Sequence, residues 1–138
     1  MIYETHNIKD LLRISTKLGD VKERPMDPVA FLRHCAVCMT EGTLRIYVSY
    51  REEKLYSAAV IHEVETYEGE KVWWVVFFWV QRNSNGTFDE LEQHLCTEAK
   101  QNQVQRLRGE IKRGYRALAN KPGWCEAYRV IEKELNYE

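Results

Sequence analysis

The chain has 138 residues, of which 44% are hydrophobic and 30% are charged, a composition that is typical of one globular domain and excludes a disordered chain. Its 20 basic and 21 acidic residues give a net charge of −1, so nucleic-acid binding, which usually rests on a basic excess, is not expected. The longest apolar run, Val72 to Val80, is too short to span a membrane. The start of the chain has no signal-peptide pattern, which favours a cytoplasmic location.

Only two of the four cysteines, Cys35 and Cys38, have the CxxC spacing of metal and redox motifs. The nearest second pair, His94 and Cys96, has a poor spacing for zinc, and the four histidines are scattered along the chain. A thioredoxin-type pair would begin a helix, whereas this pair falls late in one. We therefore predict two small apolar groups on a buried helix face, and no metal site.

The first third of the chain predicts a short strand and two helices. A strand at residues 2–4 precedes a helix that Asn7 caps and Gly19 ends. Asp27, followed by proline, is a typical start for the second helix, and Gly42 ends it.

The middle of the chain predicts an antiparallel meander of three strands. Apolar and polar residues alternate over 44–50, and two charged turns separate this segment from strands at 55–64 and 71–80. The last of these strands has no alternation, which indicates that both of its faces are buried.

The last third of the chain predicts a strand–helix–strand crossover, followed by a short helix and a segment with partial strand character. Thr87 and Glu90 fit a capping box at the start of a helix. A strand at 104–111 then follows, parallel to the strand before the helix, because a strand–helix–strand crossover returns in the same direction. We expect a short helix over 113–120 and partial strand character over 125–135. All of these elements fit one domain over residues 1–138.

The order of these elements, β-α-α-β-β-β-α-β-α-β, resembles that of the GNAT acetyltransferases over nearly the whole chain. Residues 43–64 are similar to the second and third strands of that family, and residues 74–80 with the following loop to its fourth strand and cofactor turn. Leu118 to Trp124 resembles the family's "LYEKLGF" segment. The resemblance implies an α/β (α+β) fold: a mixed sheet with an antiparallel β2-β3-β4 meander, a parallel β4/β5 pair and helices on both faces.

The resemblance also implies a site for acetyl-CoA. In the family the fourth and fifth strands splay apart at a bulge, the pantetheine lies between them, and the pyrophosphate binds the amides that begin the next helix. The matching residues here are Val80, Gln81, Arg82, Gly86 and Thr87.

The cofactor loop departs from the family pattern Arg/Gln-x-x-Gly-x-Gly/Ala. With Gln81 in the first position, the two glycine positions fall on Ser84 and Gly86, and the other registers also lose a key residue. Asp89 and Glu90 add two negative charges to the first helical turn, where they would repel a pyrophosphate. The alternative is that both are ordinary residues of a helix start.

The catalytic groups of the family are also incomplete. The position of its leaving-group tyrosine falls on Ala119, and Tyr115, one turn earlier, is the candidate to replace it. The alternative for Tyr115 is a packed side chain. The family's glutamate base has no counterpart between Val72 and Val80. The substitutes that we consider, each with the alternative of an ordinary strand residue, are His62, Glu63, Glu65 and Glu110.

Two functions follow from this comparison. We favour a degenerate acetyltransferase-like protein used for binding or assembly, with no cofactor, and the alternative is an active acetyl-CoA-dependent N-acetyltransferase acting on an amine. The compact, divergent sequence is similar in style to GNAT-like proteins of tailed phages, which would place it in the host cytoplasm or the virion. The expected partner is another protein or a second copy of the chain, and no membrane.

A basic cluster near the end of the chain is a further candidate site. It could bind the phosphates of CoA or of nucleic acid, and the alternative is a solvated face balanced by acidic neighbours. The cluster consists of Arg106, Arg108, Lys112, Arg113 and Arg116.

Overall fold

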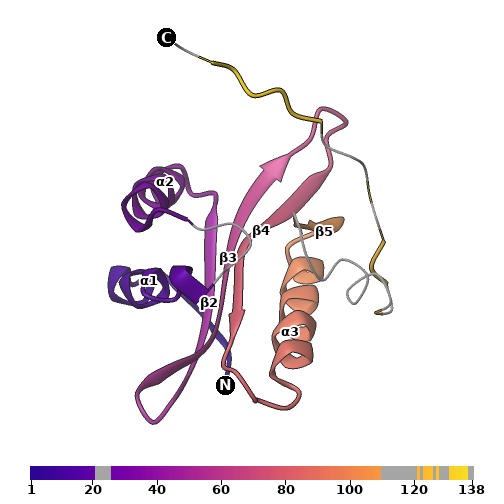
Figure 1. Cartoon of the computed structure of the whole chain (residues 1–138). Coiled ribbons are helices and arrows are strands. Elements are labelled where there is room, and N and C mark those ends of the chain that lie inside the picture. The colour runs from indigo at the N-terminus through magenta and orange to yellow at the C-terminus, as the bar shows by residue number, and fades with distance from the viewer. Residues whose placement is uncertain (21–25, 110–120, 122, 126, 128–130, 137–138) are drawn as a thin grey trace.

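The computed structural model describes residues 1–20, 26–109, 121, 123–125, 127 and 131–136 (Figure 1). The short element η1 is a 3-10 helix. The elements, in chain order, are β1 (Tyr3–Thr5), α1 (Ile8–Ser15), η1 (Leu18–Asp20), α2 (Pro28–Glu41), β2 (Leu44–Arg51), β3 (Lys54–Glu65), β4 (Lys71–Val80), α3 (Thr87–Gln101) and β5 (Arg106–Arg108).

The strands form one sheet in the order β1-β2-β3-β4-β5. Neighbouring strands are antiparallel except for β4 and β5, which are parallel. Helices α1 and α2 cover one face of the sheet and α3 covers the other (Figure 1). The predicted mixed α/β sheet, with its meander, its parallel pair and its helices on both faces, is confirmed.

The helix boundaries follow from local capping chemistry. The side chain of Asn7 accepts a hydrogen bond from the amide of Lys9, and that of Asp27 accepts one from the amide of Val29. Gly42 ends α2 with a φ of 74°, a left-handed conformation that favours glycine. These caps are as predicted, although α1 ends earlier, at Ser15.

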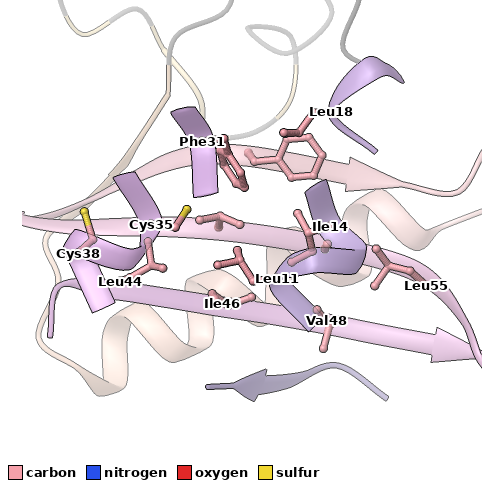
Figure 2. Close-up of a cluster of buried hydrophobic side chains, with 13 residues drawn as sticks. Leu11, Ile14, Leu18, Phe31, Cys35, Cys38, Leu44, Ile46, Val48 and Leu55 are labelled. Carbon is pink, nitrogen blue, oxygen red and sulfur yellow. The ribbon is translucent and has the colours of Figure 1, made fainter. Parts of the chain in front are cut away.

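Each face of the sheet carries its own core. The core beneath α1 and α2, the first core, has Leu11, Ile14, Phe31 and other apolar side chains at its centre (Figure 2). Cys35 and Cys38 belong to this core, with 1% and 2% of their surfaces exposed, so the prediction of two buried thiols is confirmed. The core beneath α3, the second core, consists of Tyr47, Ala59, Ile61, Trp73, Leu91, Leu95 and Ala99.

The apolar run of β4 serves both cores because the strand contains a bulge. Val60 pairs with Phe77 and Ile61 pairs with Val75, so that Val76 is the extra residue. The bulge reverses the alternation of side chains: Trp73 and Val75 pack in the second core before it, and Phe78 and Val80 do so after it. The prediction of a strand covered on both faces is confirmed in this form.

The predicted capping box is wrong, two predicted strands are incomplete, and one predicted helix is not tested. The capping box does not form, because Gly86 is the N-cap of α3 with a φ of 76° and Thr87 is already helical. β5 is only three residues long, and no described residue from 121 onward lies in a strand. The helix expected at 113–120 lies outside the described residues.

Candidate functional site

On the outer edge of β4, the neighbouring strand β5 pairs with only the first half of the strand. Trp74 and Arg108 form the last pair between β4 and β5. Gly109 still approaches β4, since a Cβ at that position would lie 3.7 Å from the carbonyl oxygen of Val75. Beyond this point no described residue forms a strand beside β4, and residues 75–80 have a strand neighbour, β3, on their inner edge only.

The bulge lies at the same place as this loss of pairing. Because Val76 has no partner in β3, the local ladder of hydrogen bonds is interrupted and the strand bends. No described residue pairs with the outer edge between Val76 and Val80, and the backbone groups on that edge have the geometry to bond a ligand in the way that an added strand would.

The first turn of α3 follows directly and offers unpaired amides. Gly86 precedes the helix, and no side chain caps the amides of its first turn. The N–H groups of Thr87, Phe88 and Asp89 have no partner within the helix, because the first turn of any α-helix lacks acceptors. A Cβ at Gly86 would meet no atom within 4 Å. Such an open helix start attracts anions.

The charges at this helix start partly cancel. Asp89 and Glu90 are exposed, but the ammonium group of Lys121 lies 2.8 Å from Asp89 Oδ1 and 4.5 Å from the centroid of the Phe88 ring. The hydrogen bond to Asp89 raises the pKa of Lys121. Lys121 therefore places a positive charge beside the first turn of α3. The sequence analysis predicted only repulsion of phosphate at this turn.

The aromatic side chains at the end of β4 point to opposite faces. Phe78 packs against Phe88 of α3, with ring centroids 4.8 Å apart. Trp79 packs against the first core, and its indole N–H donates to Asp20 at 3.1 Å. Of these two aromatic residues, only Phe78 lies on the side of the sheet that α3 covers.

The predicted cofactor-binding residues gather at one end of the sheet. Val80 packs in the second core, and the amide of Gln81 donates to the carbonyl oxygen of Tyr56 at 2.9 Å, which continues the pairing with β3. Arg82 is exposed, and Gly86 is followed by Thr87, which is buried at the helix start. Tyr115, the candidate catalytic residue, lies outside the described residues.

The candidate bases lie away from the bulge or have other partners. Glu63 accepts a hydrogen bond from the indole of Trp73 at 3.0 Å and lies 3.7 Å from the guanidinium of Arg45. Glu65 is exposed at the end of β3, and Glu110 lies outside the described residues. His62, on the neighbouring position of β3, packs against the ring of His34.

The sequence analysis did not predict one group of side chains that the structure brings together. His34 and Cys38 of α2 and His62 of β3 bring their ligand atoms within 4.8 Å of one another. The spacing of His34 and Cys38, one helical turn, was a usable signal. The third member, His62, comes from a strand, and only the packing of α2 on the sheet brings it to the other two.

The basic cluster is only partly described. The guanidinium of Arg106 lies 3.5 Å from Glu70, and Arg108 is half-buried. Its other members lie outside the described residues, so a phosphate-binding role stays a prediction. No helix in the described part of the chain is long and apolar enough to cross a membrane.

Comparisons with known proteins found similar structures but no matching sequence. No family model and no curated protein matches the sequence. A possible acetyltransferase from Clostridium difficile is 15% identical, covers 99% of this chain and 98% of its own, and has a TM-score of 0.75. A predicted acetyltransferase with acetyl-CoA from Clostridium acetobutylicum is 15% identical, with coverages of 97% and 96% and a TM-score of 0.73.

A third similar structure is that of an enzyme whose name states its acceptor. The ribosomal-protein-alanine N-acetyltransferase from Brucella melitensis biovar Abortus is 12% identical, with coverages of 98% and 99% and a TM-score of 0.73. The chain therefore has the GNAT fold, as the order of its elements predicted. Identities this low establish the fold and leave the activity to the site itself.

Proposed function

We propose that this chain is an acetyltransferase-like protein that binds acetyl-CoA along the outer edge of β4, and that its role is binding or assembly. The observation that carries the proposal is the junction at the end of β4. There an edge without a described strand neighbour, beginning at Val75, leads through Gly86 into a helix start with no side-chain cap.

The residues at this junction fit the two chemically different parts of the cofactor. Backbone N–H and C=O groups between Val76 and Val80 suit the amides of the pantetheine arm, and the amides of Thr87 to Asp89 suit the phosphates. Lys121 supplies a cation beside the same turn. Bound acetyl-CoA would supply an activated acetyl thioester.

Binding without transfer is supported by the side chains around the bulge. Those of Val75, Val76 and Phe77 are apolar and accept no proton, and the nearby carboxylate of Glu63 is already engaged by Trp73 and Arg45. Proton removal from an amine needs a base within hydrogen-bond reach, and the described side chains at residues 75–77 supply none. The cytoplasmic location and the protein partner or second copy of the chain stay predictions.

The second candidate function is N-acetyl transfer to an amine. It is supported by the fold that this chain shares with the acetyltransferases above. In that case Tyr115 is the proposed acid for the departing CoA thiolate.

Calorimetry with acetyl-CoA, with desulfo-CoA as a second ligand, tests the binding site. We expect micromolar affinity for both. Asn85 is exposed and precedes the N-cap, so Asn85→Glu adds a charge beside the phosphates and should weaken binding roughly tenfold. Asn85→Gln, its neutral match in size, should bind like the unaltered protein. Absence of heat at millimolar ligand would refute the proposed site.

An acetyl-transfer assay separates the two functions. The proposed binding role predicts no release of free CoA above background with a panel of primary amines and peptide N-termini. Transfer that falls about 100-fold in Tyr115→Phe, with cofactor affinity unchanged, would instead establish the enzyme.

A further inference from the structure

We propose that His34, Cys38 and His62 form a binding site for a zinc ion, separate from the cofactor site. The three ligand atoms all lie within 4.8 Å of one another. Cys38 Sγ lies 3.7 Å from His34 Nε2, and the rings of His34 and His62 meet edge to face with centroids 5.9 Å apart.

The local fold explains why these three side chains meet. His34 and Cys38 are four residues apart on α2, and side chains at that spacing lie one above the other on the same helix face. His62 lies two residues beyond Val60, so it shares the face of β3 that α2 covers. Figure 2 shows Cys38 at one end of the first core, next to Leu44, which is the β2 partner of His62.

The spacing of the atoms suits tetrahedral zinc. Zinc–sulfur bonds of about 2.3 Å and zinc–nitrogen bonds of about 2.0 Å put the ligand atoms of one ion roughly 3.3–3.6 Å apart. The 3.7 Å between Cys38 and His34 is already close to this value. The remaining distances, all below 4.8 Å, close by small rotations of exposed or half-buried rings.

The donor set selects the kind of metal. One thiolate and two imidazoles favour zinc over magnesium or calcium, which take oxygen ligands. Cys38 is buried, His62 is half-buried and His34 is exposed. The ion would therefore lie at the margin of the core, with its fourth position, on the His34 side, open to water.

A zinc ion here would connect α2 to β3 through side chains. Metal ligation would add a cross-link where the helix now depends on apolar packing and on a weak contact between sulfur and imidazole. None of the three ligands belongs to the outer edge of β4 or to α3. The zinc site and the acetyl-CoA site can therefore be tested independently.

Titration of the reduced, metal-free protein with Zn²⁺ and with Co²⁺ tests the proposal. Cys125→Ser serves as the background, because this exposed thiol could bind metal by itself. We expect one ion per chain, a rise in Tm with zinc, and with cobalt a near-ultraviolet charge-transfer band from the thiolate together with tetrahedral visible bands.

Three variants and one control assign the ligands. His34→Gln, His62→Gln and Cys38→Ala should each weaken zinc binding on the order of 100-fold, which is the share of one ligand in a four-ligand site. His34→Gln changes an exposed residue, so it remains informative even if Cys38→Ala fails to fold. His6→Gln, an exposed histidine outside the group, should bind zinc normally.

Two results would overturn the site. The first is that the Cys125→Ser protein, with its three proposed ligands intact, binds no zinc at micromolar concentrations. The second is cobalt binding that lacks the charge-transfer band or persists at full strength in His34→Gln.

Discussion

At the scale of single residues, the cysteines differ most in their environment. Burial raises the pKa of Cys35 to about 12, with a smaller contribution from neighbouring Cys38, and burial also raises the pKa of Cys96. Cys125 is exposed. Since the thiolate is the reactive form, a raised pKa and burial both slow alkylation.

We therefore expect iodoacetamide at pH 8 to modify Cys125 first, and Cys35 only when the protein unfolds. Peptide mapping by mass spectrometry over time gives the order. Alkylation of Cys35 at the rate of Cys125 in the folded protein would contradict the burial of α2 against the sheet.

The same raised pKa makes the free energy of unfolding depend on pH. The unfolded thiol ionises near pH 9, whereas folded Cys35 ionises only near 12, so its stabilising contribution is complete below pH 9 and is lost as the pH rises towards 12. Between pH 8 and pH 10 the loss is about 1.4 kcal/mol. Urea unfolding at both pH values measures it, and Cys35→Ala should show a smaller difference.

At the scale of elements, one buried carboxylate connects three of them. Asp10 of α1, only 8% exposed, accepts hydrogen bonds from the hydroxyl groups of Thr5, in β1, and of Tyr50, in β2. β1 already pairs with β2 at three positions, and Glu4 forms an ion pair with Arg45, so this network adds a buried side-chain connection from β1 and β2 to α1.

Asp10→Ala should lower the free energy of unfolding by about 2 kcal/mol, because it leaves two hydroxyl groups without their charged acceptor. Denaturant unfolding of the variant measures the loss. Asp27→Ala removes an exposed cap and is the matched control, with an expected loss of about 1 kcal/mol. A smaller loss in Asp10→Ala than in the control would contradict the role of the network.

The start of α3 gives a prediction about charge. Glu90 has no salt-bridge partner among the described residues and is exposed in the first turn. Glu90→Gln removes a charge that opposes phosphate and should tighten CoA binding severalfold, at a cost to helix stability of about 0.3–1 kcal/mol. Calorimetry measures the affinity, and weaker binding in Glu90→Gln would contradict phosphate binding at this helix start.

The same elements show how far the sequence could be interpreted. Asn7, Asp27 and Gly42 were predicted correctly because capping depends on neighbours in the chain. The capping box failed because Gly86 adopts a positive φ and ends the loop one residue earlier. The family resemblance implied a bulge in this strand, but the residues themselves could not show that it lies at Val76, because every residue around it is apolar.

At the scale of the whole molecule, the sequence predicted the layers but could not predict the contacts between them. Apolar patterns and caps gave the order of the elements, and the resemblance of that order to the GNAT acetyltransferases predicted the fold. The alternating strand β2 is nevertheless buried on both faces, with Val48 in the first core and Tyr47 in the second. The contact of Lys121 with Asp89 and the meeting of His62 with α2 depend on distances between remote segments. Such contacts determine function, and no local pattern encodes them.

Hydrogen exchange of the backbone amides, with and without acetyl-CoA, tests the central claim most directly. The proposed site predicts slower exchange at those amides of residues 76–80 that face the outer edge of β4 and at residues 87–89, which begin α3, and no change across α2. Calorimetric binding with unchanged exchange at these residues, or with protection elsewhere in the sheet, would contradict the proposed acetyl-CoA site.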